Sequence, residues 1–362
     1  MAQAYDAIIA TITVASDASQ VVKTMVKSTT WREGTSGTWL STNCTLTAGN
    51  TYQFRTPLSG MSSGSTAILP NIKASVTVAW DTTATPISTV GDFFMYSYAD
   101  SCTNLTSLSV PDTSGLTSVG TYFMSSYAYG CSGLTSLSVP DTSGLTSVGD
   151  DFMSCYAMSC TNLTSLGVPD TSGLTSVGDY FMNYYAYGCT NLTSLSVPDT
   201  SELTSVGDYF MYSYAYDCSN LTSLSVPDTS GLASVGDFFM GFYADSCSSL
   251  TSLSVPDTSG LPSVGVNFMY FYAYGCSSLT SLILPDSTGW FGSHNVDWNV
   301  PSGRLGYLYG YTPNSTSQTA WRALTVSGKT LYTNYIRAEN HVLLSTTPVI
   351  GAKYPLPPFR RS

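Results

Sequence analysis

Apolar and small polar residues alternate along this chain in a pattern that repeats every 29 residues. Six full units follow one another from Leu105, and each reads close to LTSLSVPDTSGLTSVGDYFMYSYAYGCTN. Self-similarity at a fixed period of this length is typical of repeat architectures. Together with a half-unit on each side, the units predict one repeat array over residues 87–289.

Each unit has two parts with different patterning. In the first part, residues such as Leu105 and Leu108 alternate with small polar residues and a proline follows, which predicts one β-strand per unit. In the second part, apolar residues such as Phe123 and Tyr127 stand three or four apart, which predicts a short helical or irregular convex segment. Gly120 separates the two parts, at a place where we expect an unusual backbone angle.

A single unit is too small to bury its apolar side chains on its own. Stacked units bury both of their sides and pair their strands with those of the next unit, about 4.8 Å away. The sequence therefore predicts a leucine-rich-repeat-like solenoid built on a parallel β ladder.

The motif of the unit carries a resemblance to a known family. Leu105-x-x-Leu108-x-Val110-Pro111 is followed by a Val-Gly pair, an aromatic-rich turn and a cysteine three residues before the next leucine. This pattern resembles the BspA-type leucine-rich repeats of bacterial and protist surface proteins, and related repeats in some phage-encoded proteins. The resemblance implies a solenoid with a role in adhesion.

The regions on either side of the array differ from it in composition. Residues 1–86 hold alternating apolar runs with Gly and Ser turns between them, which predict a β-rich N-terminal assembly or anchor domain. Residues 290–362 hold three of the six tryptophans and end in a basic, Pro-rich tail. Because a solenoid needs its last coil covered, we expect a C-terminal cap here.

Charge is unevenly distributed along the chain, which has 12 basic and 23 acidic residues and a net charge of −11. No Lys or Arg stands between Lys73 and Arg304, although that stretch contains 18 Asp and one Glu. Nucleic-acid-binding proteins concentrate basic residues on one face, so we expect no nucleic-acid partner. No signal peptide or run of 18 apolar residues is visible, so we expect no membrane insertion.

One cysteine recurs in every unit. Stacked units bring these thiols near one another, but parallel Cβ directions and an odd number argue against disulfides. No zinc-site spacing or histidine partner accompanies them, so no metal is firmly predicted. We expect a structural ladder of buried thiols at Cys102, Cys131, Cys160, Cys189, Cys218, Cys247 and Cys276.

An aspartate follows the proline of every unit. The sequence Pro-Asp-Thr-Ser-Gly is strong turn chemistry, so capping of a turn is the favoured role. Like charges stacked about 5 Å apart repel each other, and bound cations such as Ca²⁺ are the alternative. The column consists of Asp112, Asp141, Asp170, Asp199, Asp228, Asp257 and Asp286.

Three columns in the second part of the unit vary between repeats, whereas the strand part hardly varies. Side chains that pack from coil to coil would be copied unchanged, so we expect the variable columns to face outward. Tyr, Phe, Ser, Asn and Gly dominate them, which is typical of adaptable recognition surfaces; neutral drift on a convex face is the alternative. The candidate binding residues are Phe93, Tyr96, Tyr122, Tyr180, Tyr184, Tyr209, Tyr212, Phe238, Phe242, Tyr270 and Phe271.

The sequence gives little support for catalysis. The only histidines are His294 and His341, both outside the array, and no nucleophile elbow or phosphate-binding loop occurs. We therefore expect a protein that is not an enzyme and needs no cofactor.

These observations predict a binding or structural protein displayed on a virion or a cell surface. The first hypothesis is a phage virion adhesin, such as a tail fibre or capsid decoration, that recognises a host-surface protein or glycan. A bacterial cell-surface adhesin and a self-assembling extracellular filament subunit are the alternatives. We expect a homo-oligomer, or virion or filament neighbours, with contacts through residues 1–86 and the basic tail. A weaker alternative is an ice- or carbohydrate-binding face built from the exposed Thr and Ser columns.

Overall fold

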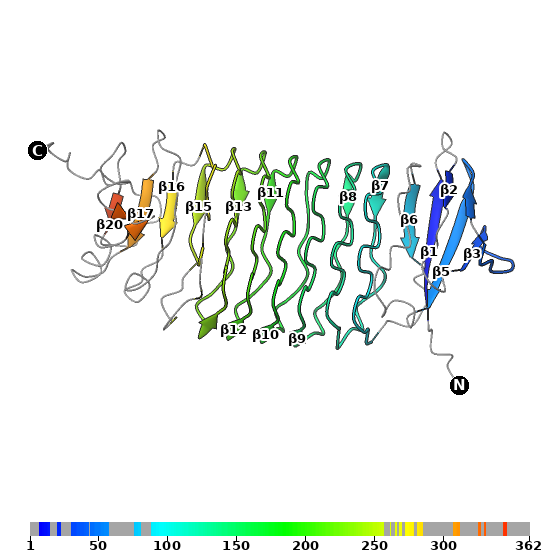
Figure 1. Cartoon of the computed structure of the whole chain (residues 1–362), viewed down its shortest axis with the longest axis horizontal. Helices are drawn as coiled ribbons and strands as arrows, with labels where there is room; N and C mark the ends of the chain where they lie inside the picture. The colour runs from blue at the N-terminus through cyan, green and yellow to red at the C-terminus, as the bar shows by residue number, and fades with distance from the viewer. Residues whose placement is uncertain are drawn as a thin grey trace, which may run out of the picture.

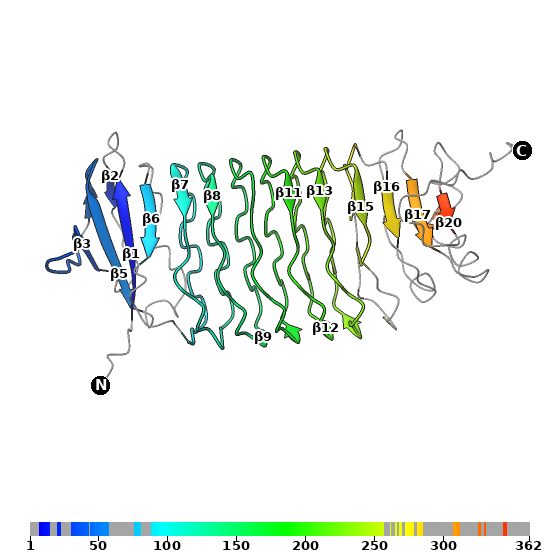
Figure 2. The ribbon, with the colours of Figure 1, turned by 180° about the vertical axis from the view of Figure 1, so that it is seen from behind.

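A computed structural model describes most of the array and parts of both flanks. The described residues are 7–14, 20–22, 30–42, 44–57, 76–80, 88–256, 261, 265, 268–269, 272–278, 281–284, 307–311, 325–326, 329–330 and 343–345. The coils follow one another along the long axis of a rod (Figure 1), and the view from behind shows the same order (Figure 2).

The N-terminal strands form one sheet with the first coils of the array. The sheet order is β3-β5-β1-β6-β7-β8. β3, β5, β1 and β6 pair antiparallel, whereas β6 pairs with β7 in parallel, as the coils do with one another. The strands are β1 (Ala7–Val14), β3 (Thr30–Glu33), β5 (Thr51–Pro57), β6 (Val76–Trp80), β7 (Leu105–Leu108) and β8 (Ser136–Leu137). The N-terminal sheet thus covers the open side of the first coil.

Alternating residues of the N-terminal sheet form a small core that continues into the rod. Ile12, Tyr52 and Phe54 are buried, and they belong to the same apolar cluster as the coils. A second pair of antiparallel strands, β2 (Gln20–Val22) and β4 (Cys44–Leu46), accompanies this sheet.

Most of the described coils carry two short parallel strand segments, one more than the sequence predicted. The first set follows the Leu-Thr-Ser-Leu motif and, after β8, includes β11 (Ser194–Leu195), β13 (Ser223–Leu224), β15 (Ser252–Ser254) and β16 (Ser281–Leu284). The second set is β9 (Ser147–Val148), β10 (Ser176–Val177), β12 (Ser205–Val206) and β14 (Ser234–Val235). In both sets, residues 29 apart are partners, such as Ser147 with Ser176 and Ser194 with Ser223. The second set arises because Leu-Thr-Ser-Val has the same spacing of apolar residues as Leu-Thr-Ser-Leu.

The aromatic second part of the unit is not helical, and the structure contains no helix in its described residues. The expectation of a helical turn was wrong, and the irregular alternative applies. Every second residue has a positive φ, such as Tyr180 (59°), Met182 (48°) and Tyr184 (53°). Amides of this segment therefore donate to neighbouring coils: Met182 donates to the carbonyl of Phe152 and Tyr184 to that of Tyr212. These bonds between coils replace the bonds within a helix.

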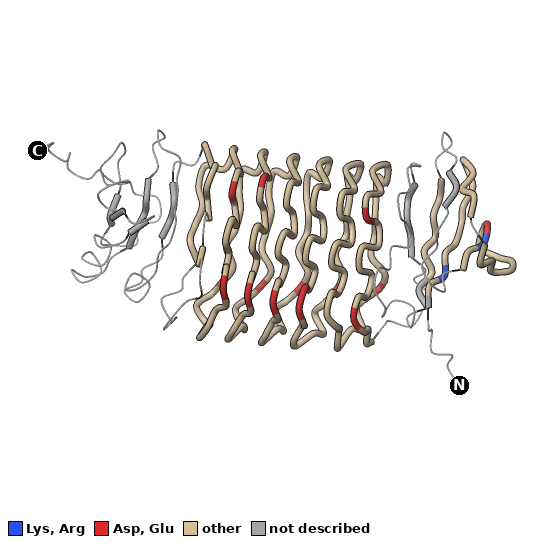
Figure 3. The backbone as a smooth tube through the Cα atoms, in the orientation of Figure 1, with Lys and Arg blue, Asp and Glu red and all other residues tan. Residues whose placement is uncertain are grey.

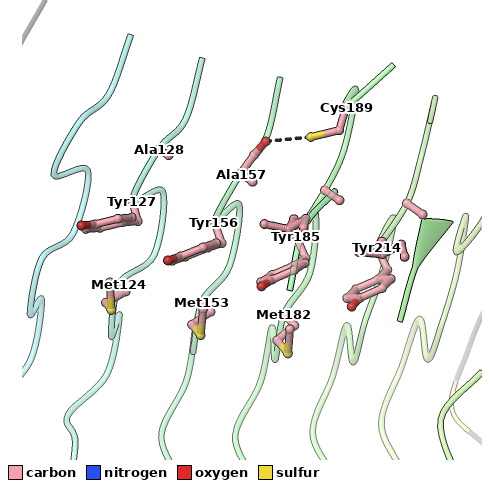
Figure 4. Packing of buried hydrophobic residues seen from close by; sticks show 14 of the residues in the cluster. Met124, Tyr127, Ala128, Met153, Tyr156, Ala157, Met182, Tyr185, Cys189 and Tyr214 are labelled. Carbon is pink, nitrogen blue, oxygen red and sulfur yellow. Dashed lines mark hydrogen bonds between the residues drawn. The ribbon is translucent and has the colours of Figure 1, made fainter. Parts of the chain in front are cut away.

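Identical side chains stack through the core of the rod. Phe, Met, Tyr, Ala and Cys recur at the same places in successive coils and are buried in every described coil. Figure 4 shows Tyr127, Tyr156, Tyr185 and Tyr214 in one column beside a column of methionines. The ring centroids of Tyr127 and Tyr156 lie 5.3 Å apart, and the planes differ by 9°. The apolar spacing that resembled a helix therefore marks the inward face of a segment built of successive turns.

The parallel ladder continues beyond both ends of the predicted array. β6 pairs with β7 before residue 87, and after residue 289 β17 (Tyr307–Tyr311) pairs with β16, and β20 (Leu343–Ser345) with β17. β18 (Thr325–Val326) and β19 (Lys329–Thr330) form an antiparallel pair. Among the residues that the structure places, no helix has the length and apolar character that a membrane span requires.

Candidate recognition face

The first variable column forms two stacks of partly exposed rings. Phe93 stacks on Tyr122 with a centroid distance of 4.7 Å. Two coils further along, Tyr180 stacks on Tyr209 at 4.7 Å and Tyr209 stacks on Phe238 at 4.6 Å. Tyr180 is the most exposed of these, at 37%. The described rings of this column are thus partly exposed.

The second column does not face outward in every coil. Tyr96 and Tyr212 are partly exposed, but Ser125, Ser154 and Asn183 are buried. The inference that all variable columns lie at the surface was therefore wrong at these positions.

Gly241 shows why this column varies. A Cβ on Gly241 would lie 3.0 Å from a ring carbon of Tyr212 in the preceding coil. The glycine thus leaves room for a large neighbour. Variation here reflects packing between adjacent coils, so a residue that packs from coil to coil need not be copied unchanged.

The third column contributes Tyr184 and Phe242, both partly exposed. Tyr212 meets them edge-on, with centroid distances of 5.5 Å in both pairs. Two further candidates, Tyr270 and Phe271, lie outside the described residues.

A fourth variable column was missed by the sequence analysis. Tyr187 and Tyr216 stack with a centroid distance of 4.7 Å and nearly parallel planes. The equivalent residues of other coils include Asp100, Met158 and Asp245. This variation was a signal of the same kind as that in the other columns.

Together these columns place eight partly exposed rings on three successive coils. Each ring contacts at least one other ring of the set at a centroid distance of 4.6–6.2 Å. The rings are thus held in place by one another before any partner binds. We call this set the aromatic patch: Tyr180, Tyr184, Tyr187, Tyr209, Tyr212, Tyr216, Phe238 and Phe242.

The surroundings of the patch are acidic. Figure 3 shows acidic residues along the coils and, among the residues that it colours by charge, basic residues only in the N-terminal sheet. Desolvation and the nearby charge of Asp245 raise the pKa of Tyr216. Burial raises the pKa of Asp245 itself to about 6. A partner therefore meets aromatic rings in a negative field.

The aspartates after the prolines cap turns. The Asp170 carboxylate accepts hydrogen bonds from the Ser172 amide at 3.0 Å and from its hydroxyl at 2.7 Å. The same pair of bonds occurs at Asp112, Asp141, Asp199 and Asp228. Bonds from Ser172 lower the pKa of Asp170. Asp257 and Asp286 lie outside the described residues.

A second aspartate column joins successive coils directly. The carboxylates of Asp150, Asp179 and Asp208 each accept a bond of 2.7–2.9 Å from the amide 29 residues later. The glycine that precedes each aspartate does not have a positive φ, contrary to expectation. A Cβ on Gly178 or Gly207 would instead overlap the backbone of the preceding coil, whereas on Gly149 it would lie 3.1 Å from the Thr121 methyl carbon. Close approach between coils explains these glycines.

The seven cysteines of the ladder are buried, and none of them forms a disulfide. From Cys131 onward, each thiol donates to the carbonyl of an alanine 32 residues earlier, and Cys189 donates to Ala157 at 3.1 Å (Figure 4). Burial raises the pKa of Cys189 to about 12. In the described part of the chain, no group of three or more His, Cys, Asp or Glu side chains is arranged to hold a metal ion.

The repeats match a known family. The family model described as BspA type leucine-rich repeat region matches residues 92–294 with six copies, which is more than half of the chain. The chain belongs to the BspA-type leucine-rich repeat family. Comparisons with curated proteins and with solved structures found no match.

The BspA-type repeats contain the whole of the aromatic patch. The matched region begins at Asp92, in the first aromatic segment, and includes every described coil up to β16. The N-terminal sheet lies before the match. The BspA-type repeats of this chain therefore supply both the scaffold and the candidate recognition residues.

Proposed function

We propose that the protein is a non-enzymatic binding protein that recognises a partner at a surface through the aromatic patch. The observation that carries this proposal is the contiguous set of eight partly exposed rings on three coils. Single exposed apolar residues are normal, whereas a contiguous group marks an interaction site. Tyrosine supplies contact area at a low cost in conformational entropy, because it has two side-chain torsions.

Packing between the rings supports the proposal. Tyr212, for example, contacts Tyr184, Tyr209 and Phe242 edge-on, so its orientation is set in the free protein. Side chains that are ordered before binding lose less entropy when a partner arrives. Membership of the BspA-type family, whose proteins are typically associated with surfaces, is consistent with adhesion.

The partner that we propose is a host-surface protein or a glycan. Display on a phage virion, the most specific hypothesis from the sequence, stays a prediction. Labelling of purified particles with an antibody against the rod, viewed by electron microscopy, tests it: unlabelled particles would contradict display on the virion.

The experiment for the patch compares two variants of the full chain. The triple variant Tyr187→Ser, Tyr212→Ser and Tyr216→Ser removes the centre of the patch. The control is Tyr129→Ser, which removes a tyrosine that is 37% exposed and lies outside the patch. Both variants and the parent are labelled and applied to a glycan array and to an array of cell-surface proteins.

We expect the parent and the control to bind the same ligand, and the triple variant to bind it at least about tenfold more weakly, the loss typical of one or two central residues. Equal binding by all three proteins would place the contact elsewhere. Binding of no glycan or surface protein by the parent would contradict the proposed function.

A further inference from the structure

The outer ring stack is interrupted at one coil. In the first variable column, the described positions are Phe93, Tyr122, Asp151, Tyr180, Tyr209 and Phe238. Rings occupy every one of them except position 151. Asp151 thus stands where the repeat elsewhere places an aromatic ring.

The interruption leaves two ring faces turned toward Asp151. Tyr122 stacks on Phe93 at 4.7 Å with one face, so its other face is directed to the coil of Asp151. Tyr180 stacks on Tyr209 at 4.7 Å, so its free face is directed to the same coil from the other side. Tyr180 is 37% exposed, whereas Tyr209, which is covered on both faces, is less exposed.

The spacing corresponds to one missing ring. Two steps between strands of about 4.7–4.9 Å place the rings of Tyr122 and Tyr180 about 9–10 Å apart. A flat group halfway between them would lie about 5 Å from each ring, which is within the range of cation–π contact.

The array contains no basic side chain that could pair with the carboxylate of Asp151. No Lys or Arg stands between Lys73 and Arg304. Asp151 is half-buried, and burial raises its pKa to about 6, although a hydrogen bond from Ser154 lowers it. Asp151 stands one coil from each ring, and its charge is the main cause that raises the pKa of Tyr122, whereas desolvation and Tyr209 raise the pKa of Tyr180 more than Asp151 does. At neutral pH a half-buried anion stands between two aromatic faces.

We propose that Tyr122, Asp151 and Tyr180 form a binding site for a guanidinium group, the arginine side chain of a protein partner. The guanidinium lies flat between the two rings and donates two hydrogen bonds to the Asp151 carboxylate. This inference rests on the proposed function, because it names the chemistry of a partner that contacts the edge of the aromatic patch at Tyr180.

Guanidinium fits this site better than other groups. It is planar, it stacks on aromatic faces and its paired N–H groups match a carboxylate. An ammonium group is compact and strongly hydrated, so it gains less from two flat rings. A neutral aromatic ring would fill the space but would bury the carboxylate without a partner, which is unfavourable.

The test uses the full chain and two blocked amino acids, N-acetyl-arginine amide and N-acetyl-lysine amide, in calorimetric titrations at pH 7.5. Asp151→Asn keeps the shape of the site and removes its charge. Asp151→Tyr restores the ring found in neighbouring coils and closes the site. Asp217→Asn is the control, because it removes an exposed charge two coils further along.

We expect the parent and Asp217→Asn to bind the arginine compound with a millimolar Kd, in the range for a single small group. The lysine compound should bind at least about fivefold more weakly. Asp151→Asn should weaken arginine binding about tenfold, and Asp151→Tyr should abolish it while its urea unfolding midpoint stays at or above that of the parent.

Equal binding of both compounds, or equal arginine binding by Asp151→Tyr and the parent, would show only attraction to the acidic rod and would overturn the proposal. No arginine binding at all would overturn it too. The patch variant at positions 187, 212 and 216 leaves this site intact. If the patch variant loses the array ligand while the parent binds no arginine compound, the arginine site alone is rejected. If the parent binds the arginine compound while the patch variant keeps the array ligand, the patch is rejected.

An arginine-containing peptide, acetyl-Gly-Gly-Arg-Gly-Gly-amide, distinguishes a protein partner from a free small molecule. We expect it to bind at least as tightly as the blocked amino acid. Exclusion of the peptide by a site that still binds the amino acid would contradict a protein partner.

Discussion

The hydroxyl of Tyr156 donates a hydrogen bond of 2.6 Å to the carbonyl oxygen of Ser138, which lies 18 residues earlier in the chain. Its ring is fully buried between those of Tyr127 and Tyr185. The same bond, to the residue 18 positions earlier, recurs at Tyr127, Tyr185, Tyr214, Tyr243 and Tyr272. Each tyrosine therefore ties the aromatic segment to the strand side across the core.

Replacing Tyr156 with Phe tests the strength of this tie. The ring stack would stay, but the Ser138 carbonyl would lose its tyrosine donor, so we expect the free energy of unfolding to fall by about 1–2 kcal/mol. Urea denaturation followed by circular dichroism measures the change. Tyr187→Phe, at a partly exposed position, is the control and should change it by less than about 0.5 kcal/mol. Equal changes in the two variants would contradict a stabilising role for the hydrogen bond of the buried hydroxyl.

The cysteine ladder should be chemically inert in the folded protein. Thiolate is the reactive form, and burial raises the pKa of Cys160, Cys189 and Cys218. At pH 8 we expect the ladder thiols to react with a thiol-specific disulfide reagent at least about 100-fold more slowly than in 6 M guanidinium chloride. Mass spectrometry of the labelled peptides assigns each site. Rapid labelling of Cys160 in the folded protein would contradict a buried ladder.

Much of the fold could be predicted from the period of the sequence. A residue copied every 29 positions lies beside its own copy in the next coil, and this identified the column of buried thiols. The motif Pro-Asp-Thr-Ser-Gly predicted the turns around residues such as Asp170 and Ser172. The strand at Leu105–Leu108 followed from alternation.

The aromatic segment could not be predicted in the same way. Phe123 and Tyr127 have helical spacing, yet their carbonyls accept bonds from the amides of Met153 and Ala99 in neighbouring coils, which local sequence does not record. Methionine at a positive φ, as at Met182, has no sequence signature. Whether a residue of the second variable column is buried depends on the size of its neighbour in the adjacent coil, as at Gly241 beside Tyr212. The sequence of one coil alone does not contain this information.

The column of residues equivalent to Gly188 tests the role of positive φ angles. Gly188 has a φ of 70°, and the equivalent Ser159 and Asp217 have 62° and 57°. A Cβ on Gly188 would find ordinary contacts, the nearest at 3.5 Å, so only the backbone angle opposes a side chain. We expect Gly188→Ala to lower the free energy of unfolding by about 1 kcal/mol. Gly207→Ala should cost more, because its Cβ would overlap the backbone of Asp179. Urea midpoints in the reverse order would contradict this distinction.

Asp245 should make stability depend on pH. Its side chain is 2% exposed and accepts a bond of 2.7 Å from the Ser246 hydroxyl. Burial, with a smaller effect of the Asp217 charge, raises its pKa from 3.8 to about 6. The folded protein therefore binds this proton more tightly than the unfolded chain. The resulting stabilisation is complete below about pH 3.8 and is lost as the pH rises through about 6.

Asp245→Asn removes that dependence, so it should raise the free energy of unfolding at pH 7.5 by about 1–2 kcal/mol and leave it nearly unchanged at pH 4. Asp112→Asn provides a control of opposite sign. Bonds from Ser114 lower the pKa of Asp112, so its charged form stabilises the fold above its ordinary pKa, and that stabilisation is lost as the pH falls. Its amide variant should be less stable than the parent at pH 7.5. Urea midpoints at the two pH values measure both variants. A loss of stability in Asp245→Asn at pH 7.5 would mean that its carboxylate is held as an acceptor that the fold needs.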